Sequence, residues 1–128
     1  MTHRFLISCP ANCEDLLRKE VEEAGGQNIK TRVRSVVFDG DAEVGYRICL
    51  RSRIGNALIR ILAEGHAETK AAIASLADTV LWESVFSDEQ SFSVLCKIAA
   101  NNKTEIVHSH YGAQLLKDSV CDRFRRVK

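Results

Sequence analysis

The order in which apolar segments and helical segments follow one another constrains the fold of this chain most strongly. Residues 5–7 (Phe-Leu-Ile) form a short apolar segment that ends at Cys9-Pro10, which predicts a buried strand over residues 3–8. A helix is expected next, with Asn12 as its N-cap and Gly25-Gly26 as its end. Its expected inner face consists of Cys13, Leu16, Leu17, Val21 and Ala24.

Residues 28–63 are expected to contain two strands and a second helix, followed by a segment whose structure is open. Residues 28–34 alternate and predict a strand, with Ile29, Thr31 and Val33 on one face and Lys30, Arg32 and Arg34 on the other. Another strand is expected to begin at 36–38 and to end at Asp39-Gly40. Asp41 is then the expected N-cap of a helix to about Ser52, with Val44 and Ile48 inward. Periodicity alone leaves 57–63 open between a strand and a helix. With a strand there, the order β-α-β-β-α-β predicts an α+β fold, with a ferredoxin-like subdomain over residues 1–60.

Residues 61–128 predict a second unit that ends on a long helix. We expect a helix over 69–79, a short irregular or helical turn over 81–86, a strand over 91–99, a polar turn at 101–103 and a helix over about 110–126. The apolar stripe of the last helix consists of Ala113, Leu116, Val120, Phe124 and Val127. One strand cannot cover this stripe, so the unit is expected to be incomplete, with residues 103–128 mobile, misplaced or buried against another molecule. Self-association through this C-terminal edge follows as an expectation.

Composition excludes several classes of protein. The apolar runs are short and interrupted by charge, so we expect no membrane span, and the N-terminus lacks the apolar core of a secretion signal. A cytoplasmic protein is therefore expected. The five cysteines are scattered without a C-x-x-C pair, which favours reduced thiols over disulfides or a zinc site.

No group of residues forms a convincing catalytic site. The glycines fit caps and turns better than a phosphate-binding loop, and the chain has only Pro10, so we expect no enzyme activity and no cofactor in this chain. His108 and His110 could offer two metal ligands, but a helix entry capped by Ser109 is favoured. A thiol enzyme using Cys13 or Cys121 has little support.

Basic residues are the remaining signal of function. The net charge is only +1, but residues 28–60 and 103–128 are net basic, whereas 11–27 and 61–102 are net acidic. The basic sets are Lys30, Arg32 and Arg34; Arg47, Arg51 and Arg53; and Lys103, Lys117, Arg123, Arg125 and Arg126. Such sets can neutralise the phosphates of a nucleic acid, although composition alone slightly favours ordinary solvated charge.

Several motifs, in order, resemble bacterial ribosomal RNA guanine-N2 methyltransferases that carry a THUMP domain. Residues 8–25 resemble their opening through Glu14, Leu16, Leu17, Glu20 and Gly25, with Asn12 in place of the usual glycine. Two further stretches match: Val37, Phe38 and Gly40, and then Tyr46, Leu50, Ser52 and Arg53. Ser35 and Ala57 stand where the family commonly has glycine and arginine. The stretch from Ser109 to Phe124 resembles the THUMP signature S-x-Y-G-A-x-x-x-K-D-A-I-x-D-x-F.

The resemblance implies a ferredoxin-like subdomain over 1–60 followed by an incomplete THUMP domain over 61–128, a module associated with structured RNA. The chain would be the substrate-recognition fragment of an rRNA methyltransferase, with S-adenosylmethionine expected only for the parent enzyme. The RNA-binding residues it suggests are Arg53, Ser109, Tyr111, Lys117, Arg123 and Arg126. Lys117 and Arg53 are expected to contribute more to RNA binding than Lys30. The alternative is a small α+β protein-interaction domain without a nucleic-acid role.

Overall fold

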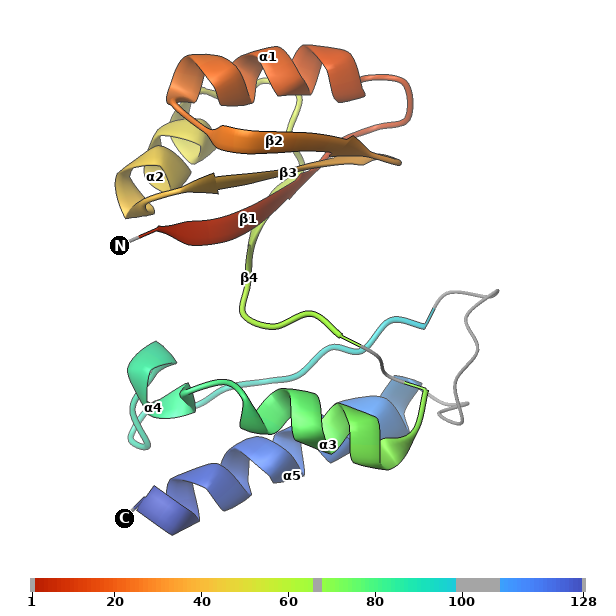
Figure 1. Ribbon diagram of the computed structural model, residues 1–128, viewed down its shortest axis with the longest axis vertical. Coiled ribbons are helices and arrows are strands. Elements are labelled where there is room, and N and C mark those ends of the chain that lie inside the picture. Colours follow the sequence, from red (N-terminus) through yellow and green to blue (C-terminus); the bar gives the residue numbers. More distant parts are fainter. Residues whose placement is uncertain (1, 66–67, 99–108, 128) are drawn as a thin grey trace. The chain divides into compact units, whose positions relative to one another are not determined.

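The computed structural model describes residues 2–65, 68–98 and 109–127; the side chains of Ser109, His110 and Val127 are not part of this description (Figure 1). The chain divides into two compact units, Met1–Leu62 and Ala63–Lys128. Each unit has its own elements, and each is described separately below.

Unit 1 is a four-stranded antiparallel sheet with two helices. Its elements are β1 (His3–Ser8), α1 (Glu14–Ala24), β2 (Gln27–Arg32), β3 (Ser35–Gly40), α2 (Ala42–Arg51) and β4 (Ala57–Ile61). The strand order is β2-β3-β1-β4, with β1 paired to both β3 and β4. The α+β class and the ferredoxin-like order predicted from the sequence are therefore confirmed, and the open segment at 57–63 contains a strand.

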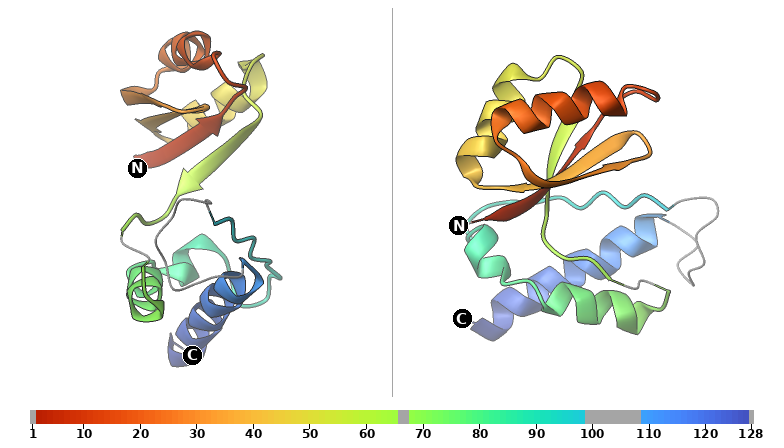
Figure 2. Two further views of the ribbon diagram at one scale, coloured as in Figure 1. Left: turned by 90° about the vertical axis from the view of Figure 1, so that its right-hand side faces the viewer. Right: turned by 45° about the horizontal axis from the view of Figure 1, so that its top comes forward.

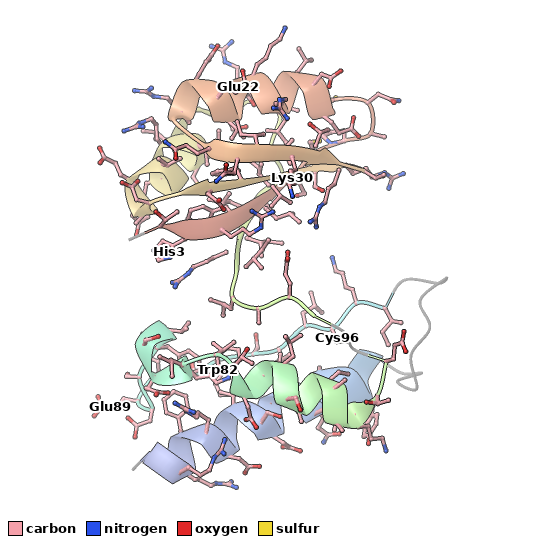
Figure 3. All side chains as sticks on the ribbon, in the orientation of Figure 1. His3, Glu22, Lys30, Trp82, Glu89 and Cys96 are labelled. Atoms are coloured by element: carbon pink, nitrogen blue, oxygen red, sulfur yellow. The ribbon has the colours of Figure 1, made fainter. Side chains whose placement is uncertain are left out.

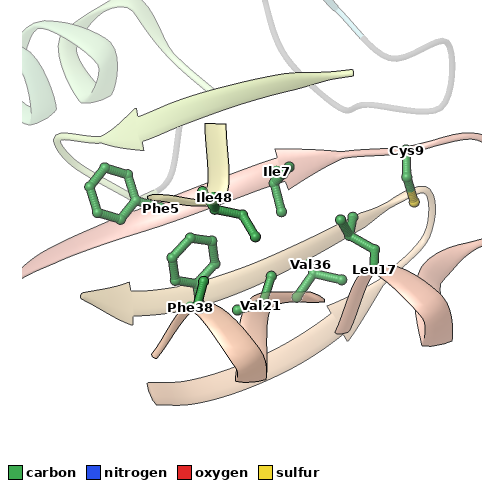
Figure 4. Close-up of a cluster of buried hydrophobic side chains, with 9 residues drawn as sticks. Phe5, Ile7, Cys9, Leu17, Val21, Val36, Phe38 and Ile48 are labelled. Carbon is green, nitrogen blue, oxygen red and sulfur yellow. The ribbon is translucent and has the colours of Figure 1, made fainter. Parts of the chain in front are cut away.

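A single hydrophobic core joins the sheet to both helices (Figure 4). Its buried residues are Phe5, Ile7, Cys9, Leu17, Val21, Ala24, Val36, Phe38 and Ile48. The rings of Phe5 and Phe38, on paired strands, lie 5.5 Å apart between centroids. On α2, a Cβ at Gly45 would come within 3.0 Å of the Phe5 ring, so this glycine lets the helix approach the sheet closely. Alternate residues of β1 and β3 thus face the helices, as period-2 strands require.

The entry to α1 differs from the prediction. Asn12 is not the N-cap but a loop residue in the left-handed region, with φ 69°, and Cys13 precedes the first helical residue. Asparagine tolerates this conformation better than most residues, which explains how it can occupy a position where the methyltransferases that the sequence resembles usually have glycine. Leu16 was also expected on the inner face, but its side chain is 54% exposed, because only one side of the helix reaches the sheet.

The hairpin between β2 and β3 corrects the predicted strand over 28–34 (Figure 2). The strand ends at Arg32, and Val33 and Arg34 form the turn, with Arg34 at φ 57°. Val33 is consequently 87% exposed rather than inward. Alternation continues across a two-residue turn, so the sequence pattern alone does not show where the strand stops.

Unit 2 contains the helices α3 (Lys70–Asp78), α4 (Trp82–Val85) and α5 (Ser109–Val127). Thr69 caps α3, because its hydroxyl oxygen accepts a hydrogen bond from the Ala72 N–H at 3.0 Å. Trp82, labelled in Figure 3, donates its indole N–H to the Ala77 carbonyl at 3.0 Å. The predicted helices over 69–79 and 110–126 and the short turn over 81–86 are confirmed, within a few residues at their ends.

The strand expected over 91–99 is absent from its described part, residues 91–98. The alternation of Phe92, Val94 and Cys96 satisfies the strand pattern, but a strand also needs a hydrogen-bonded neighbour, and the described part of unit 2 contains no strand to pair with it. The predicted turn at 101–103, His108 and Lys103 lie outside the described residues.

Candidate nucleic-acid interface

The six residues expected to bind RNA do not form one cluster. Arg53 belongs to unit 1, whereas the other five, from Ser109 to Arg126, lie along α5 of unit 2. The side chain of Ser109 is outside the description. The remaining five side chains differ in one property that decides their chemistry, namely whether their charge or ring already has a partner within the protein.

Arg53 follows α2 in a loop that α1 holds in place. The Glu20 carboxylate accepts hydrogen bonds from the Ser52 hydroxyl at 2.8 Å and from the Arg53 N–H at 2.9 Å. The Ser52 Oγ in turn accepts from the Gly55 N–H at 3.0 Å. The backbone of Arg53 is therefore fixed, while its exposed guanidinium has no ion pair among the described residues. A fixed backbone with a free cation suits contact with a phosphate.

Tyr111 lies in the first turn of α5 and is partly exposed. The Lys70 ammonium lies 4.9 Å from the centroid of its ring, within the range of a cation–π interaction. The ring thus helps to join α5 to the start of α3. A base could stack on Tyr111 only at the part of its surface that Lys70 leaves open.

Lys117 is exposed on α5 and borders a shallow pocket of about 190 Å³. The other lining residues are Phe92, Ser93, Val94, Ala113 and Gln114. Phe92 packs against Phe86, at 5.2 Å between centroids, yet remains 38% exposed. The pocket therefore combines a cation without an ion pair in the described chain, an accessible aromatic ring and two neutral polar side chains. These groups suit a phosphate together with an unstacked base.

Arg123 already has a partner. Its Nη2 and Nε donate to the two carboxylate oxygens of Glu83 at 2.8 and 3.2 Å, which ties α4 to α5. This hydrogen bonding lowers the pKa of Glu83 and raises the pKa of Arg123. A bidentate arginine is a poor candidate for binding RNA, because it would first have to leave its carboxylate.

Arg126 and Arg125 are also paired, though more loosely. Arg126 donates to Asp78 on α3 and Arg125 to Asp122 on α5, both at 3.2 Å. All four side chains line a groove of about 450 Å³ between the two helices, together with Ala74 and Ser119. The two acids offset the two arginines, so this groove is a weaker site for an anion than the pocket beside Lys117.

Sequence reasoning missed Phe92 as a candidate for stacking. The alternating pattern of residues 91–99 assigned it to a strand. Among the other aromatic side chains, Tyr46 is exposed on α2, whereas Trp82 is half-buried and hydrogen-bonded. Only the packing of Phe92 against Phe86 shows which part of its ring stays accessible, and no local pattern predicts that contact.

Other chemistries find no support in the described part of the chain. Groups of three or more histidine, cysteine or acidic side chains that could hold a metal do not occur there. Cys13 and Cys121 are half-buried free thiols without a hydrogen bond to a base among the described residues, and burial raises the pKa of Cys9. Among the residues described, no helix is long and apolar enough to cross a membrane.

The glycines do not form a cradle for S-adenosylmethionine. Gly25, at φ 99°, ends α1 by donating its N–H to the Glu22 carbonyl, and Gly26 donates to the Val21 carbonyl. A nucleotide-binding glycine loop instead opens a helix, where free N–H groups face the phosphate or carboxylate. Gly25 and Gly26 therefore do not form such a loop.

The fold consists of a ferredoxin-like domain followed by a helical module. Residues 4–58 match the RlmL ferredoxin-like domain, and residues 67–128 match the THUMP domain. The chain thus consists of these two domains, in the order that the sequence predicted.

Two curated relatives carry the same name. The chain is 38% identical over 122 residues to the ribosomal RNA large subunit methyltransferase K/L of Hydrogenovibrio crunogenus, covering 95% of this chain and 16% of the relative. It is 32% identical to the enzyme of that name from Pseudoalteromonas atlantica, covering 96% of this chain and 17% of the relative. The chain therefore spans about a sixth of the length of the relatives it matches.

Solved structures show the same fold. A predicted N6-adenine-specific DNA methylase from Listeria monocytogenes matches with a TM-score of 0.89 and 18% identity, over 98% of this chain and 32% of that one. The methyltransferase-like protein SMU.472, crystallised with SAH, matches with a TM-score of 0.78 and 16% identity, over 98% of this chain and 33% of that one. At such identities these structures support the fold alone.

Proposed function

We propose that the chain binds structured RNA through the surface of α5 around Lys117. The observation that carries this proposal is the pocket beside Lys117, which joins a cation without an ion pair to the partly exposed ring of Phe92 within the THUMP domain. Lysine neutralises a phosphate and the ring stacks on a base. Arg53, from unit 1, adds a second free cation. Tyr111, Arg123, Arg126 and Ser109 then belong to the surroundings of the site rather than to its centre.

We further propose that this binding serves a methyl transfer to ribosomal RNA in the cytoplasm. The curated relatives named above are ribosomal RNA methyltransferases, and the chain covers about a sixth of their length. S-adenosylmethionine would supply the methyl group in a longer parent enzyme. The part played by this chain is to hold the RNA, because it contains the ferredoxin-like and THUMP domains.

A titration of a structured RNA stem–loop at two salt concentrations tests the proposed function. Lys117→Ala and Arg53→Ala should weaken binding about three- to tenfold and lower the salt slope by about one unit each. Lys30→Ala should have a smaller effect, and Arg125→Ala serves as the matched control, because Arg125 is paired to Asp122 on the same helix. Equal affinities for all five proteins, or binding that ignores salt, would contradict the assignment.

Self-association is a second candidate role for unit 2. The observation that favours it is Leu95, which is 82% exposed in the segment that precedes α5, with Leu81 also exposed. Exposed apolar side chains of this size commonly mark an interaction site. Sedimentation of the chain over a range of concentrations should show a dimer that Leu95→Ser weakens, and a monomer at every concentration would exclude this role.

A further inference from the structure

The β2–β3 hairpin carries a second group of cations without ion pairs, far along the chain from α5. Lys30, Arg32 and Arg34 are all exposed, and none of them forms an ion pair with a described residue. Most other arginines near a carboxylate do form one: Arg4 pairs with Asp39 and Arg18 with Glu22. The hairpin therefore concentrates positive charge that forms no close ion pair in the described chain, while Asp39 and Glu14 attract Lys30 and Arg34 at longer range.

The strand register places two of these cations on one face. Lys30 lies opposite Val37 and Arg32 opposite Ser35, whereas Thr31 lies opposite the core residue Val36. Lys30 and Arg32 thus share the face that is turned away from the core, about 7 Å apart along the strand. This separation is comparable to that of successive phosphates along a nucleic-acid strand. Lys30 is labelled in Figure 3.

The third cation lies on a turn whose backbone is fixed from both sides. The Arg34 N–H donates to the Glu14 carboxylate at 3.1 Å, and the Arg34 carbonyl accepts from the Cys9 N–H at 2.9 Å. These bonds hold Arg34 in the left-handed region, at φ 57°, which an arginine rarely adopts. Strained backbone persists where the surroundings enforce it, and it is frequent at binding sites.

Glu14 holds this turn over the whole neutral range of pH. Hydrogen bonds from its own N–H and from the Arg34 N–H lower the pKa of its carboxyl. The carboxylate therefore stays ionised and occupied by backbone donors. It lies near Arg34 without forming an ion pair with its guanidinium, which remains available to a ligand.

We propose that the tip of the β2–β3 hairpin is a second RNA contact, in which Arg32 and Arg34 bind the phosphate backbone on either side of Val33. The proposal rests on the proposed function, since it adds a contact to the same RNA. The exposed Val33 fits against a sugar between two bound phosphates. The fixed turn presents both arginines with little loss of backbone entropy, which favours binding to a rigid, regularly spaced polyanion.

RNA fits this surface better than the other polyanions that a basic patch could meet. An anionic membrane would need a larger apolar face to insert, and Val33 is the sole large apolar side chain in this exposed turn. An acidic protein partner would not require cations that are spaced like successive phosphates, as Lys30 and Arg32 are. Arginine forks also match phosphate geometry bidentately.

The test compares Arg34→Asn and Arg32→Gln with Lys19→Gln in the full chain. Asparagine tolerates the left-handed turn, so Arg34→Asn should keep the thermal midpoint while it removes the charge. Lys19→Gln removes the same charge from α1, where Lys19 is exposed and without an ion pair in the described residues. The probe is an RNA stem–loop titrated at two salt concentrations.

We expect Arg34→Asn and Arg32→Gln each to weaken binding about three- to tenfold and to lower the salt slope by about one unit. Arg34→Lys should restore only part of the affinity, because lysine keeps the charge but not the bidentate fork, and Lys19→Gln should bind like the unchanged chain. An equal loss for Lys19→Gln would overturn the proposal, because it would reflect net charge alone. The proposal would also be overturned if Arg34→Asn and Arg32→Gln weakened binding to vesicles of anionic lipid but not binding to RNA.

The outcome for Lys117→Ala separates this inference from the proposed function. If Lys117→Ala weakens RNA binding and the hairpin variants do not, the hairpin contact is wrong and the proposed function stands. If the unchanged chain does not bind the stem–loop in low salt, both proposals fail. Additive losses in Lys117→Ala combined with Arg34→Asn would support two independent contacts with the same RNA.

Discussion

The two units bury their apolar side chains to very different extents. Unit 1 has nine residues in one buried cluster, which joins side chains of β1 and β3 to α1 and α2. In the described part of unit 2, the buried apolar residues are Ala77, Val80 and Val120. Its three helices are held instead by half-buried rings and by ion pairs such as Arg123–Glu83.

The comparison shows how a chain of ordinary composition can have an uneven distribution of stability. Burial of apolar surface is the dominant stabilising term, whereas exposed ion pairs contribute little. We therefore expect unit 1 to resist unfolding more than unit 2. Trp82, the one tryptophan of the chain, lies in unit 2 and reports on that unit by its fluorescence.

The largest effect is expected for Phe38→Ala in unit 1. The side chain is fully buried between the sheet and both helices, so its loss should lower the free energy of unfolding by about 3–5 kcal/mol. Urea unfolding followed by far-UV circular dichroism measures this change. The urea midpoint of the transition followed by Trp82 fluorescence should shift much less. Equal shifts of the two midpoints would mean that the two units unfold together.

A smaller effect is expected for Phe124→Ala in unit 2. Its ring lies 5.2 Å from that of Phe86 and is only half-buried, so the loss should be about 2 kcal/mol. The midpoint of the Trp82 fluorescence transition should fall, while amide exchange in β1 and β3 stays unchanged. A loss as large as that of Phe38→Ala would remove the distinction between the units.

The ion pair between α4 and α5 should make the stability of unit 2 sensitive to acid. Because Arg123 lowers the pKa of Glu83 in the folded state, the pair stabilises unit 2 fully above the ordinary glutamate pKa. This contribution is lost as the pH falls below that value and through the lowered one. Glu83→Gln should abolish the acid sensitivity of Trp82 fluorescence, and a variant that keeps the acid transition would refute this role.

The smallest effect on stability is expected for Lys117→Ala. The side chain is exposed and without an ion pair in the described residues, so the free energy of unfolding should change by less than about 0.5 kcal/mol. Thermal unfolding of the variant checks this value. A larger loss would show that Lys117 supports α5, and its effect on RNA binding would then be indirect.

Most of unit 1 could be predicted from the sequence because its signals are local. Asp41 caps α2 as expected, its carboxylate accepting from the Val44 N–H at 2.9 Å, and the apolar runs at 5–7 and 36–38 lie in β1 and β3. The errors fall where the backbone leaves ordinary conformations, at Asn12 and at Val33-Arg34. Left-handed residues other than glycine are rare enough that no local pattern favours them.

Unit 2 and the candidate site were harder to predict, because they depend on contacts between distant residues. The alternation of Phe92, Val94 and Cys96 predicted a strand, but pairing is a property of two segments. Arg123 and Lys117 are equivalent cations in the sequence, and only the position of Glu83 separates a structural arginine from a free lysine. The expected domain boundary after residue 60 stays a prediction.

The Glu20 carboxylate has a consequence for how this domain can change through evolution. It joins α1 to the exit of α2 by accepting hydrogen bonds from the Ser52 hydroxyl and the Arg53 N–H. A change of Glu20 alone would leave the serine hydroxyl and a backbone N–H without their acceptor, so selection should act on the pair. In related sequences we therefore expect Glu20 and Ser52 to be retained or replaced together.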